Sequence, residues 1–336
     1  MTGREIHLVA RPAGAPLERD FALVEAEVPE PAAGQMLVRN TWMSLDPAQR
    51  VRMHAGASGY LPAFELDQPL DGWAVGTVLA SRAEGFAEGD SVLHNLGWRD
   101  YAVVDPASER PPQRLHVDAN TPDRAYLGPL GWSALTSYVG LFDVAELRDG
   151  DIVFVSGAAG AVGSLVVQIA KVTGHTVIAS AGSEEKVAYV RDQLGADAAF
   201  CYRDGEVGDL LRAAAPDGID VYFDNVGGDH LQAALDVLRV KGRVALCGAI
   251  SSYNASEPVP GPSNLFNAVA KGLTLRGFLA RMYVHRMDDF RRDMQRWLAD
   301  GSVVYAETIV EGLDRAPAGF VDMLAGGNVG KSIVRI

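Results

Sequence analysis

Two patterns of apolar positions follow one another along the chain, and the change falls near residue 150. Before it, short runs of alternating apolar and polar residues are separated by turns rich in glycine, proline and aspartate. Alternation with a period of two predicts half-buried β-strands, and several short strands suit a small barrel or sandwich. The predicted strands are 6–10, 21–27, 35–41, 74–81, 91–93 and 101–104.

From residue 151 onward, apolar β-branched runs alternate with runs of helical periodicity. Such alternation predicts a doubly wound parallel sheet with helices between its strands. A helical segment at 122–141 precedes this part, and a strand–helix–strand tail at 307–310, 314–325 and 331–336 follows it. The predicted strands of the sheet are 151–156, 176–181, 198–202, 221–224, 243–248 and 273–279.

The first strand of this sheet leads into a glycine-rich turn, SGAAGAVGS at 156–164, and then into a predicted helix over 161–170. Gly160 would let the backbone approach a pyrophosphate, and Gly163 would let the helix pack close to the strand. The free N–H groups at the helix start suit phosphate. Because Ala158 replaces the first glycine of G-x-G-x-x-G, the turn alone fits any tight strand-to-helix connection. The flanking strands and helix favour a dinucleotide site.

The end of the second strand of the sheet bears on the choice between NAD and NADP. Residues 180–183 contain no carboxylate that would bond a ribose 2′-hydroxyl or repel a 2′-phosphate. Ser183 and Lys186 are placed to bind that phosphate, and Tyr202 lies on the same edge at the adenosine end. The glutamates at 184 and 185 leave open a solvated lysine paired with a glutamate. We predict NADP.

Composition and charge narrow the class of protein. A length of 336 residues suggests two domains, and 48% hydrophobic with 22% charged residues is ordinary for a globular protein. The formal charge of −13 argues against nucleic acid or an anionic membrane as a partner. The first residues, MTGREIHLVARPAG, lack the apolar core of a signal peptide, and no apolar run has the length of a membrane span. We expect a cytoplasmic protein.

The two cysteines, Cys201 and Cys247, have no cysteine or histidine nearby at metal-ligand spacing. Two cysteines cannot form a four-cysteine zinc site. Both fall at predicted strand ends, where a buried cysteine behaves as a small apolar residue. We therefore expect no metal.

Longer motifs are spread over nearly the whole chain, and FDNVGG (223–228) and CGAISSYN (247–254) are the most specific. With them the chain resembles the medium-chain dehydrogenase/reductase superfamily. Within it, the chain is most similar to the zinc-free NADPH-dependent alkenal and alkenone double-bond reductases, which include prostaglandin, plant double-bond and curcumin reductases. The other motifs are SLDPAQRVRM (44–53), GYLPAFELDQPLDGWAVGTV (59–78), LGPLGWSALTSYVGLFD (127–143), AAGAVGS (158–164), AGSEEKVAYV (181–190), LGADAAFCY (194–202) and GNVGKSIV (327–334).

The resemblance implies an α/β fold in which a GroES-like β-barrel domain contains an inserted Rossmann doubly wound parallel sheet. It places the barrel, with the substrate and catalytic role, at 1–125 and 303–336, and the Rossmann NADP-binding domain at 126–302. It also implies a homodimer and a small-molecule substrate.

The resemblance also implies site residues. It places two tyrosines, Tyr253 and Tyr60, near the substrate carbonyl, where hydride from NADPH would add to the β-carbon of an α,β-unsaturated ketone or aldehyde. A phenol there would stabilise the developing enolate. The residues implied to bind the cofactor are Gly160, Ala161, Val162, Gly163, Ser183, Lys186, Tyr202, Asn225, Cys247, Gly248, Ala249, Ile250, Ser251, Ser252, Tyr253, Phe278, Leu279, Ala280 and Asn328.

One departure from the family pattern bears on the substrate. The family usually has DPYMR where this chain has DPAQR at 46–50, so Ala48 replaces a tyrosine near the substrate. Two other functions stay open: a quinone reductase of the same superfamily, and a non-catalytic NADPH-binding regulator. A zinc alcohol dehydrogenase is set aside for want of ligands.

Overall fold

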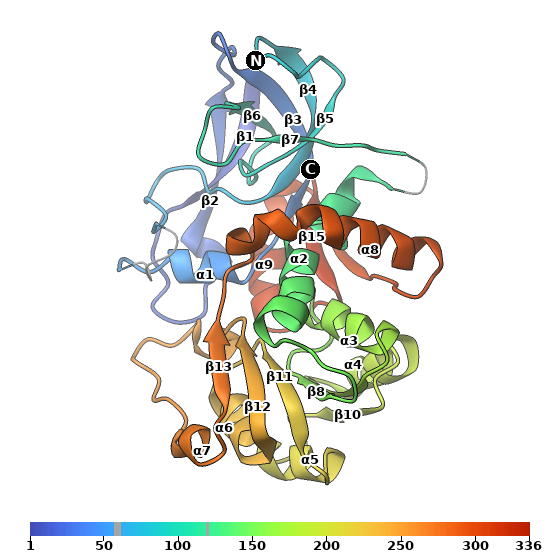
Figure 1. The fold of residues 1–336 in the computed structure, drawn as a ribbon. Helices are drawn as coiled ribbons and strands as arrows, with labels where there is room; N and C mark the ends of the chain where they lie inside the picture. The colour runs from blue at the N-terminus through green and yellow to red at the C-terminus, as the bar shows by residue number, and fades with distance from the viewer. Residues whose placement is uncertain (57–61, 119–120) are drawn as a thin grey trace. The chain divides into compact units, whose positions relative to one another are not determined.

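The computed structural model describes residues 1–56, 62–118 and 121–336. These residues form two compact units, one from Met1–Leu127 with Glu307–Ile336 and the other from Gly128–Ala306. Figure 1 shows the elements of both units.

The first unit is built on a seven-stranded sheet in the order β14-β15-β3-β4-β5-β7, with β6 paired to β3, and on a two-stranded sheet of β1 and β2. These strands run Thr2–Leu8 (β1), Phe21–Glu27 (β2), Met36–Ser44 (β3), Ala74–Ser81 (β4), Ser91–His94 (β5), Tyr101–Val104 (β6), Gln113–Arg114 (β7), Glu307–Glu311 (β14) and Lys331–Arg335 (β15). Its α-helices are Ala48–Arg52 (α1) and Ala316–Leu324 (α9), and its 3₁₀ turns are Glu18–Asp20, Asp123–Leu127 and Leu313–Arg315.

Both ends of the chain contribute to the core of this unit. Strand β15 lies antiparallel to β3, with Ile333 opposite Ser44, and parallel to β14. The buried ring of Trp98 is stacked on Phe21 at 6.1 Å between centroids and meets the edge of Phe320 from α9 at 5.9 Å. Residues from the start and from the end of the sequence therefore bury one another.

The second unit holds a six-stranded sheet in the order β10-β9-β8-β11-β12-β13, and every recorded strand pair in it is parallel. The strands are Ile152–Val155 (β8), Thr176–Ala181 (β9), Ala198–Cys201 (β10), Ile219–Asp224 (β11), Leu238–Leu246 (β12) and Thr274–Gly277 (β13). The helices are Trp132–Val139 (α2), Gly163–Val172 (α3), Glu184–Ala188 (α4), Val207–Ala214 (α5), Gly228–Val237 (α6), Phe266–Ala270 (α7) and Met287–Ala299 (α8). Shorter helical turns are Gly140–Val144, Tyr189–Gln193, Ile250–Ser252 and Ala280–Arg286.

The predicted α/β class, with a β-rich part and a doubly wound sheet, is confirmed, but two element predictions were wrong. The helix expected over 122–141 is divided into a 3₁₀ turn ending at Leu127 and α2 beginning at Trp132. Gly131 caps α2 in an extended conformation, and the nearby Pro129 has no N–H to continue a helix. Strand β12 begins at Leu238, five residues before the predicted start at 243, and includes Lys241 with a φ of 64°.

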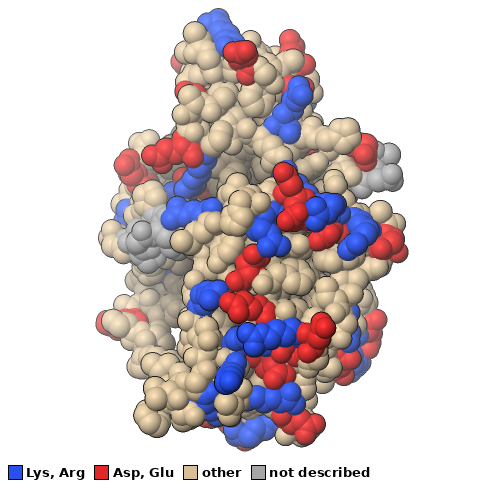
Figure 2. All heavy atoms as spheres, viewed as in Figure 1, with Lys and Arg blue, Asp and Glu red and all other residues tan. Residues whose placement is uncertain are grey.

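Charged side chains of both signs are mixed over the face shown in Figure 2. Along α8, Arg292 lies 2.8 Å from Asp289, and Arg296 lies 3.8 Å from Asp293, both at a spacing of three residues. Exposed pairs of this kind add little to stability. In the part of the chain that the structure describes, no helix has both the length and the apolar character to cross a membrane.

Two buried histidines predict that the protein loses stability in acid. His94 receives a hydrogen bond from the Leu96 N–H at 3.1 Å and shares another with Asn40 at 2.9 Å. Burial lowers the pKa of His94 from 6.5 to about 3 and that of His230 from 6.5 to about 4. Below about pH 6.5 these histidines therefore bind protons in the unfolded chain but stay neutral in the folded chain. The free energy of unfolding is highest, as far as they contribute, above this pH and falls as the pH is lowered.

Between pH 7.5 and pH 5, each of these histidines should lower the free energy of unfolding by about 2 kcal/mol. Urea unfolding at both pH values measures the difference. The variant His230→Leu should remove about half of the histidine contribution, whereas the control His116→Gln, at a side chain that is 89% exposed, should change nothing. An unchanged pH dependence in His230→Leu would contradict this assignment.

Candidate functional site

The carboxyl ends of the six parallel strands lie along one edge of the sheet in the second unit. The chain connects β8 to β9 and β10 on one side and β11 to β12 and β13 on the other, so the strand order reverses between β8 and β11. Ligands of such sheets bind in the crevice at this switch point. Two hydrogen bonds join the strand ends there: the Asn225 N–H donates to Ser156 Oγ at 3.1 Å, and Asn225 Nδ2 donates to the Ser156 carbonyl at 2.8 Å.

The glycine-rich turn lies at the end of β8, beside this crevice. Gly157 has a φ of 60°, a left-handed conformation that favours glycine. A Cβ at Gly163 would overlap the Gly157 carbonyl oxygen and lie 2.8 Å from Ala158 Cα. Among the described residues, a Cβ at Gly160 would meet only the Gly157 oxygen, at 3.4 Å. Gly163 therefore seats α3 against the turn, while Gly160 leaves the backbone open to a close approach.

The start of α3 lies two residues later than predicted, at Gly163, so Ala161 and Val162 belong to the turn. The first N–H groups of a helix have no partners within it. A turn without side chains at the point of approach, followed by a ten-residue helix, fits the pyrophosphate of a dinucleotide.

The residues predicted for the adenosine end lie together after β9 and β10. Ser183 is the N-cap of α4, and its hydroxyl accepts the Lys186 N–H at 3.3 Å. The Tyr202 hydroxyl lies against Gly182, where a Cβ would be only 2.7 Å away. The Tyr202 ring meets the edge of His230 at 5.2 Å. Because Gly182 has no side chain, Tyr202 at the end of β10 can pack directly against the end of β9.

A buried polar chain under the switch point was missed by the sequence analysis. The Tyr222 hydroxyl lies 2.9 Å from Ser156 Oγ and 2.7 Å from Asp224 Oδ1. The same carboxylate oxygen accepts the N–H groups of Val226 at 3.0 Å and Gly227 at 2.7 Å. Burial raises the pKa of Asp224 and raises that of Tyr222 well above its ordinary value. The signal available in the sequence was an aspartate at the end of an apolar strand, followed by Asn-Val-Gly-Gly.

The segment Cys247–Tyr253 follows β12 at this edge of the sheet and is held by hydrogen bonds to the end of β11. The Asp224 carbonyl accepts the N–H groups of Cys247 at 2.9 Å and Gly248 at 3.0 Å. Ile250 N–H donates to the Asn225 carbonyl at 3.3 Å, and Ser251 Oγ donates to the Val226 carbonyl at 2.6 Å. Ser252 Oγ closes the turn on the Ala249 carbonyl at 2.8 Å.

Two side chains of this segment differ in what they offer chemically. Burial, with the nearby Asp224 carboxylate, raises the pKa of the Cys247 thiol to about 12, so it stays protonated at neutral pH. The Tyr253 hydroxyl accepts the Ala249 N–H at 3.4 Å. This bond uses an oxygen lone pair and not the phenolic proton.

The other predicted residues lie after β13, in the first unit and outside the described part of the chain. Phe278 directly follows β13, is 9% exposed and meets Phe223 at 6.2 Å, and Leu279 and Ala280 continue the chain from it. Asn328 belongs to the first unit, where its Nδ2 donates to the Gly330 carbonyl at 2.9 Å. Tyr60 lies outside the described residues.

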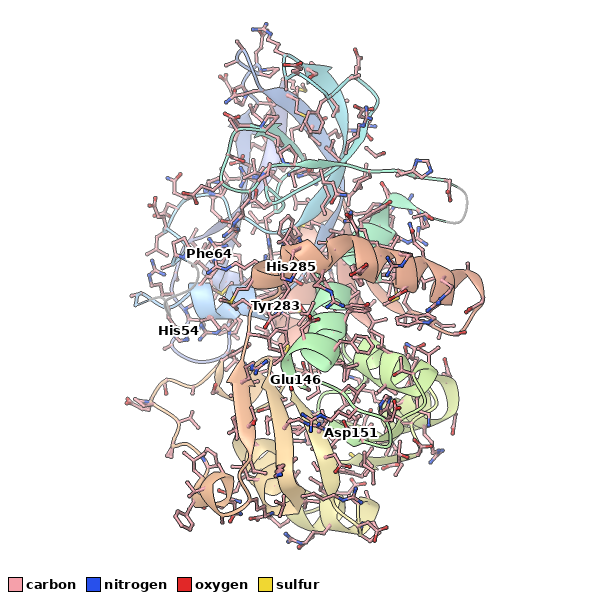
Figure 3. The ribbon with its side chains drawn as sticks, in the orientation of Figure 1. His54, Phe64, Glu146, Asp151, Tyr283 and His285 are labelled. Carbon is pink, nitrogen blue, oxygen red and sulfur yellow. The ribbon has the colours of Figure 1, made fainter. Side chains whose placement is uncertain are left out.

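The DPAQR segment forms the start of α1 in the first unit, with Ala48 half-buried as the first helical residue. Figure 3 labels two side chains near it, His54 and Phe64. Arg50 Nη1 lies 3.1 Å from His54 Nε2, and the Arg52 guanidinium lies 3.9 Å from the centre of the Phe64 ring. Ala48 itself presents only a methyl group.

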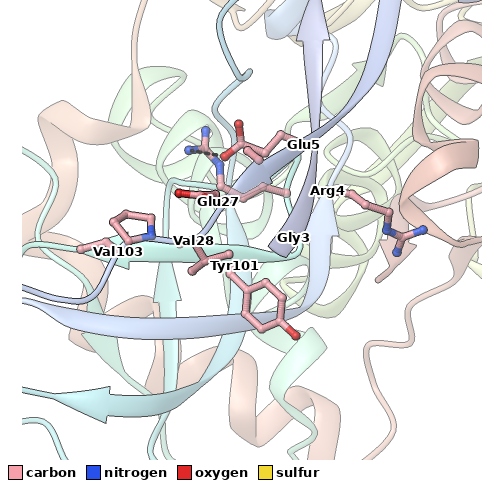
Figure 4. A pocket seen from close by; sticks show the side chains of 11 residues that line it. Gly3, Arg4, Glu5, Glu27, Val28, Tyr101 and Val103 are labelled. Carbon is pink, nitrogen blue, oxygen red and sulfur yellow. Dashed lines mark ion pairs between the residues drawn. The ribbon is translucent and has the colours of Figure 1, made fainter. Parts of the chain in front are cut away.

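Two further features were not expected from the sequence. One ligand atom from each of Glu184, Cys201 and Asp204 lies within 4.8 Å of the others, a group that linear spacing could not reveal because it joins the ends of two strands. In the first unit, a pocket lies between β1, β2 and β6, and Figure 4 shows the Arg99–Glu5 ion pair in it, at 3.9 Å. Of the predicted site residues that the structure describes, none lines this pocket.

Comparison with known proteins places these features in a family. Residues 4–110 match the family model described as the N-terminal domain of oxidoreductase, and residues 161–300 match the one described as zinc-binding dehydrogenase. The chain is 38% identical to a putative NADP-dependent oxidoreductase, YfmJ, of Bacillus subtilis (99% of this chain, 97% of the relative). It is 36% identical to the NADPH-dependent curcumin reductase of Escherichia coli (98% and 95%) and 37% identical to the NADP-dependent 2-alkenal reductase of Nicotiana tabacum (96% and 94%).

A solved structure agrees with the sequence relatives. The complex of CurA from Vibrio vulnificus with NADPH has a TM-score of 0.93 and 37% identity, over 99% of this chain and 98% of that one. The fold and the site are those of a dinucleotide-dependent oxidoreductase. The chain belongs to the medium-chain dehydrogenase/reductase family, in its group of NADPH-dependent alkenal and alkenone double-bond reductases.

Proposed function

We propose that this protein uses NADPH to reduce the carbon–carbon double bond of α,β-unsaturated ketones and aldehydes. The observation that carries the proposal is the convergence of the glycine turn, Asn225 and the Tyr253 segment at the switch point of one sheet. The full-length similarity to reductases of this chemistry supports it.

We assign the cofactor contacts by the strand end from which each residue comes. The turn after β8 binds the pyrophosphate, and the ends of β9 and β10 bind the adenosine half. The ends of β11 to β13 contact the nicotinamide half. Asn328 is assigned to the cofactor from the first unit. The proposed contacts are Gly160–Gly163, Ser183, Lys186, Tyr202, Asn225, Cys247–Tyr253, Phe278–Ala280 and Asn328.

When bound, NADPH supplies the hydride that adds to the β-carbon of the substrate, and a proton taken up at the α-carbon completes the reduction. Tyr253 then donates its phenolic hydrogen bond to the carbonyl oxygen, where negative charge develops, and Tyr60 is proposed as a second donor. A phenol is suited to this role because it keeps its proton at neutral pH. The Ala249 N–H donates to the Tyr253 hydroxyl oxygen at 3.4 Å, a contact that does not use the phenolic proton.

The test is NADPH oxidation by the purified protein over a panel of enones, enals and quinones, with NADH as the control cofactor. We expect turnover of enones and enals with NADPH and much weaker turnover with NADH. Turnover of quinones alone would favour the quinone reductase. NADPH binding without turnover of any compound would favour the non-catalytic regulator.

We assign residues 126–302 to an NADP-binding domain, and residues 1–125 with 303–336 to a domain that supplies the substrate side of the site. Both cysteines are free thiols, which suits the reducing cytoplasm. We therefore propose a cytoplasmic enzyme.

We also propose a homodimer joined through the sheet of the second unit. Strand β13 is at the edge of that sheet, and Thr274, Arg276 and Gly277 are exposed along it. The preceding helix α7 exposes two large apolar side chains, Phe266 at 75% and Val269 at 73%. Pairing two edges would satisfy the backbone groups of β13 and cover apolar surface.

Light scattering of the eluted protein should give twice the 35.8 kDa chain mass. The change Val269→Asp should shift it towards the monomer, while Val240→Asp, at another exposed valine of the same unit, is the comparison for general destabilisation. A chain that elutes as a monomer at micromolar concentration contradicts the homodimer.

A further inference from the structure

Arg203 lies where the proposed cofactor site meets solvent, and the sequence analysis assigned it no role. It follows Tyr202 at the end of β10, and its side chain is exposed. Its guanidinium lies 5.9 Å from the centre of the Tyr202 ring. This contact is the one recorded for the Arg203 side chain among the described residues, so the cation rests on an aromatic face and not on a carboxylate.

The aromatic ring under Arg203 is itself held in place. Its hydroxyl lies against Gly182, one residue before Ser183, and its ring makes a T-shaped contact with His230. His230 in turn is stacked on the buried ring of Phe154 in β8, with the rings 7° from parallel. Ring contacts therefore connect Phe154 in the core through His230 to Tyr202. They fix the position of the Tyr202 ring on which the Arg203 guanidinium lies.

Two carboxylates lie at this edge, beside the proposed phosphate site. The carboxylates of Glu184 and Asp204 lie within 4.8 Å of Cys201 Sγ and of each other, at the ends of the same two strands. Both are exposed and would repel a phosphate brought to Ser183 and Lys186. Lys186 brings one positive charge to the proposed phosphate site, and Arg203 adds a second at the end of β10.

We propose that Arg203 is a specificity-determining residue that selects the 2′-phosphate of NADPH over the 2′-hydroxyl of NADH. The guanidinium has several N–H donors in one plane, so it binds phosphate oxygens while its flat face stays on Tyr202. The proposal rests on the proposed function, because it requires the adenosine half of the cofactor at the ends of β9 and β10.

The experiment measures binding directly, by calorimetry with the full chain, and does not depend on turnover. The probes are NADP⁺, NAD⁺ and 2′,5′-ADP, a fragment that carries the 2′-phosphate without the nicotinamide. In Arg203→Gln, the Kd for NADP⁺ and for 2′,5′-ADP should rise about tenfold while that for NAD⁺ changes less than about twofold. The variant's affinity for NADP⁺ should also depend less steeply on salt.

Two further variants make the result specific to this position. Arg203→Lys keeps the charge but loses the planar donors, so we expect a Kd between those of the wild type and of Arg203→Gln. Arg82→Gln removes an equally charged residue, 59% exposed in the first unit, and should leave all three Kd values unchanged.

The outcomes separate this inference from the proposed function. Equal rises for NADP⁺ and NAD⁺, or no rise for either, overturn the role of Arg203 while leaving NADPH as the cofactor. Failure of the wild-type protein to bind NADP⁺ or 2′,5′-ADP would overturn the proposed cofactor site itself.

Discussion

Replacing Gly163 with alanine is expected to weaken NADPH binding by about 100-fold and to destabilise the second unit. The added Cβ would overlap the Gly157 carbonyl oxygen and approach Ala158 Cα at 2.8 Å. Both obstacles are backbone atoms, so no side-chain rotation can relieve the overlap. The start of α3 must move away from β8, and the N–H groups that we assign to the pyrophosphate move with it. Overpacking of this kind costs about 1–3 kcal/mol of folding free energy.

Fluorescence titration with NADPH and urea unfolding measure the two effects of Gly163→Ala. The variant Gly160→Ala separates them, because its Cβ would meet one atom, at 3.4 Å, and only a bound pyrophosphate would be crowded. It should therefore lose NADPH affinity and keep its stability. Gly261→Ala, where a Cβ has nothing within 4 Å, is the neutral control. Wild-type affinity in both Gly160→Ala and Gly163→Ala would remove the turn from the site.

Replacing Tyr253 with phenylalanine is expected to lower kcat on an enone by about 100-fold while the KM for NADPH changes less than about twofold. Loss of one hydrogen-bond donor to a developing oxyanion typically costs a factor of about 10²–10³ in kcat. The ring remains, so the backbone hydrogen bonds that hold residues 247–252 to β11 should persist. The lost bond from the Ala249 N–H is long, at 3.4 Å, and contributes little.

Steady-state kinetics with one enone and varied NADPH measure both parameters. Tyr189→Phe is the matched control: it removes the same atom from a buried hydroxyl that has no hydrogen-bond partner in the described structure. It should leave kcat unchanged. If Tyr253→Phe keeps wild-type turnover, Tyr253 is not the donor, whereas a large rise in the NADPH KM would assign it to cofactor binding alone.

The strands and their order in the chain were largely accessible from the sequence, because β-branched runs and turn residues encode them locally. Strand β9 ends at the predicted residues, and β4 and β6 do also. The helix over 122–141 failed because apolar periodicity continues through Pro129 and Gly131, where the backbone does not. Apolar periodicity indicates which face of a helix is buried. It does not show whether the backbone hydrogen bonds of the helix continue without a break.

The sequence predicted the residues of the candidate site only where they lie in a known motif. The Ser156–Tyr222–Asp224 chain was missed because it depends on β11 lying beside β8, although 66 residues separate Tyr222 from Ser156. Arg203 was missed for a related reason. Its importance comes from the carboxylates of Glu184 and Asp204, which the strand order brings to the same edge. Neither relation is visible in linear spacing.

The joining of the two chain ends in the first unit has a consequence for how the protein is made. Lys331 donates hydrogen bonds to the Leu45 carbonyl and to Asp46, both at 2.8 Å, and its partner Leu45 lies 286 residues earlier. At the usual pace of translation, β3 waits on the order of tens of seconds for β15 to leave the ribosome. During that time the second unit, complete at Ala306, can already fold. The Trp42–Ser44 end of β3 meanwhile lacks its partner strand, so chaperone demand in a growing cell should be concentrated on this incomplete first unit.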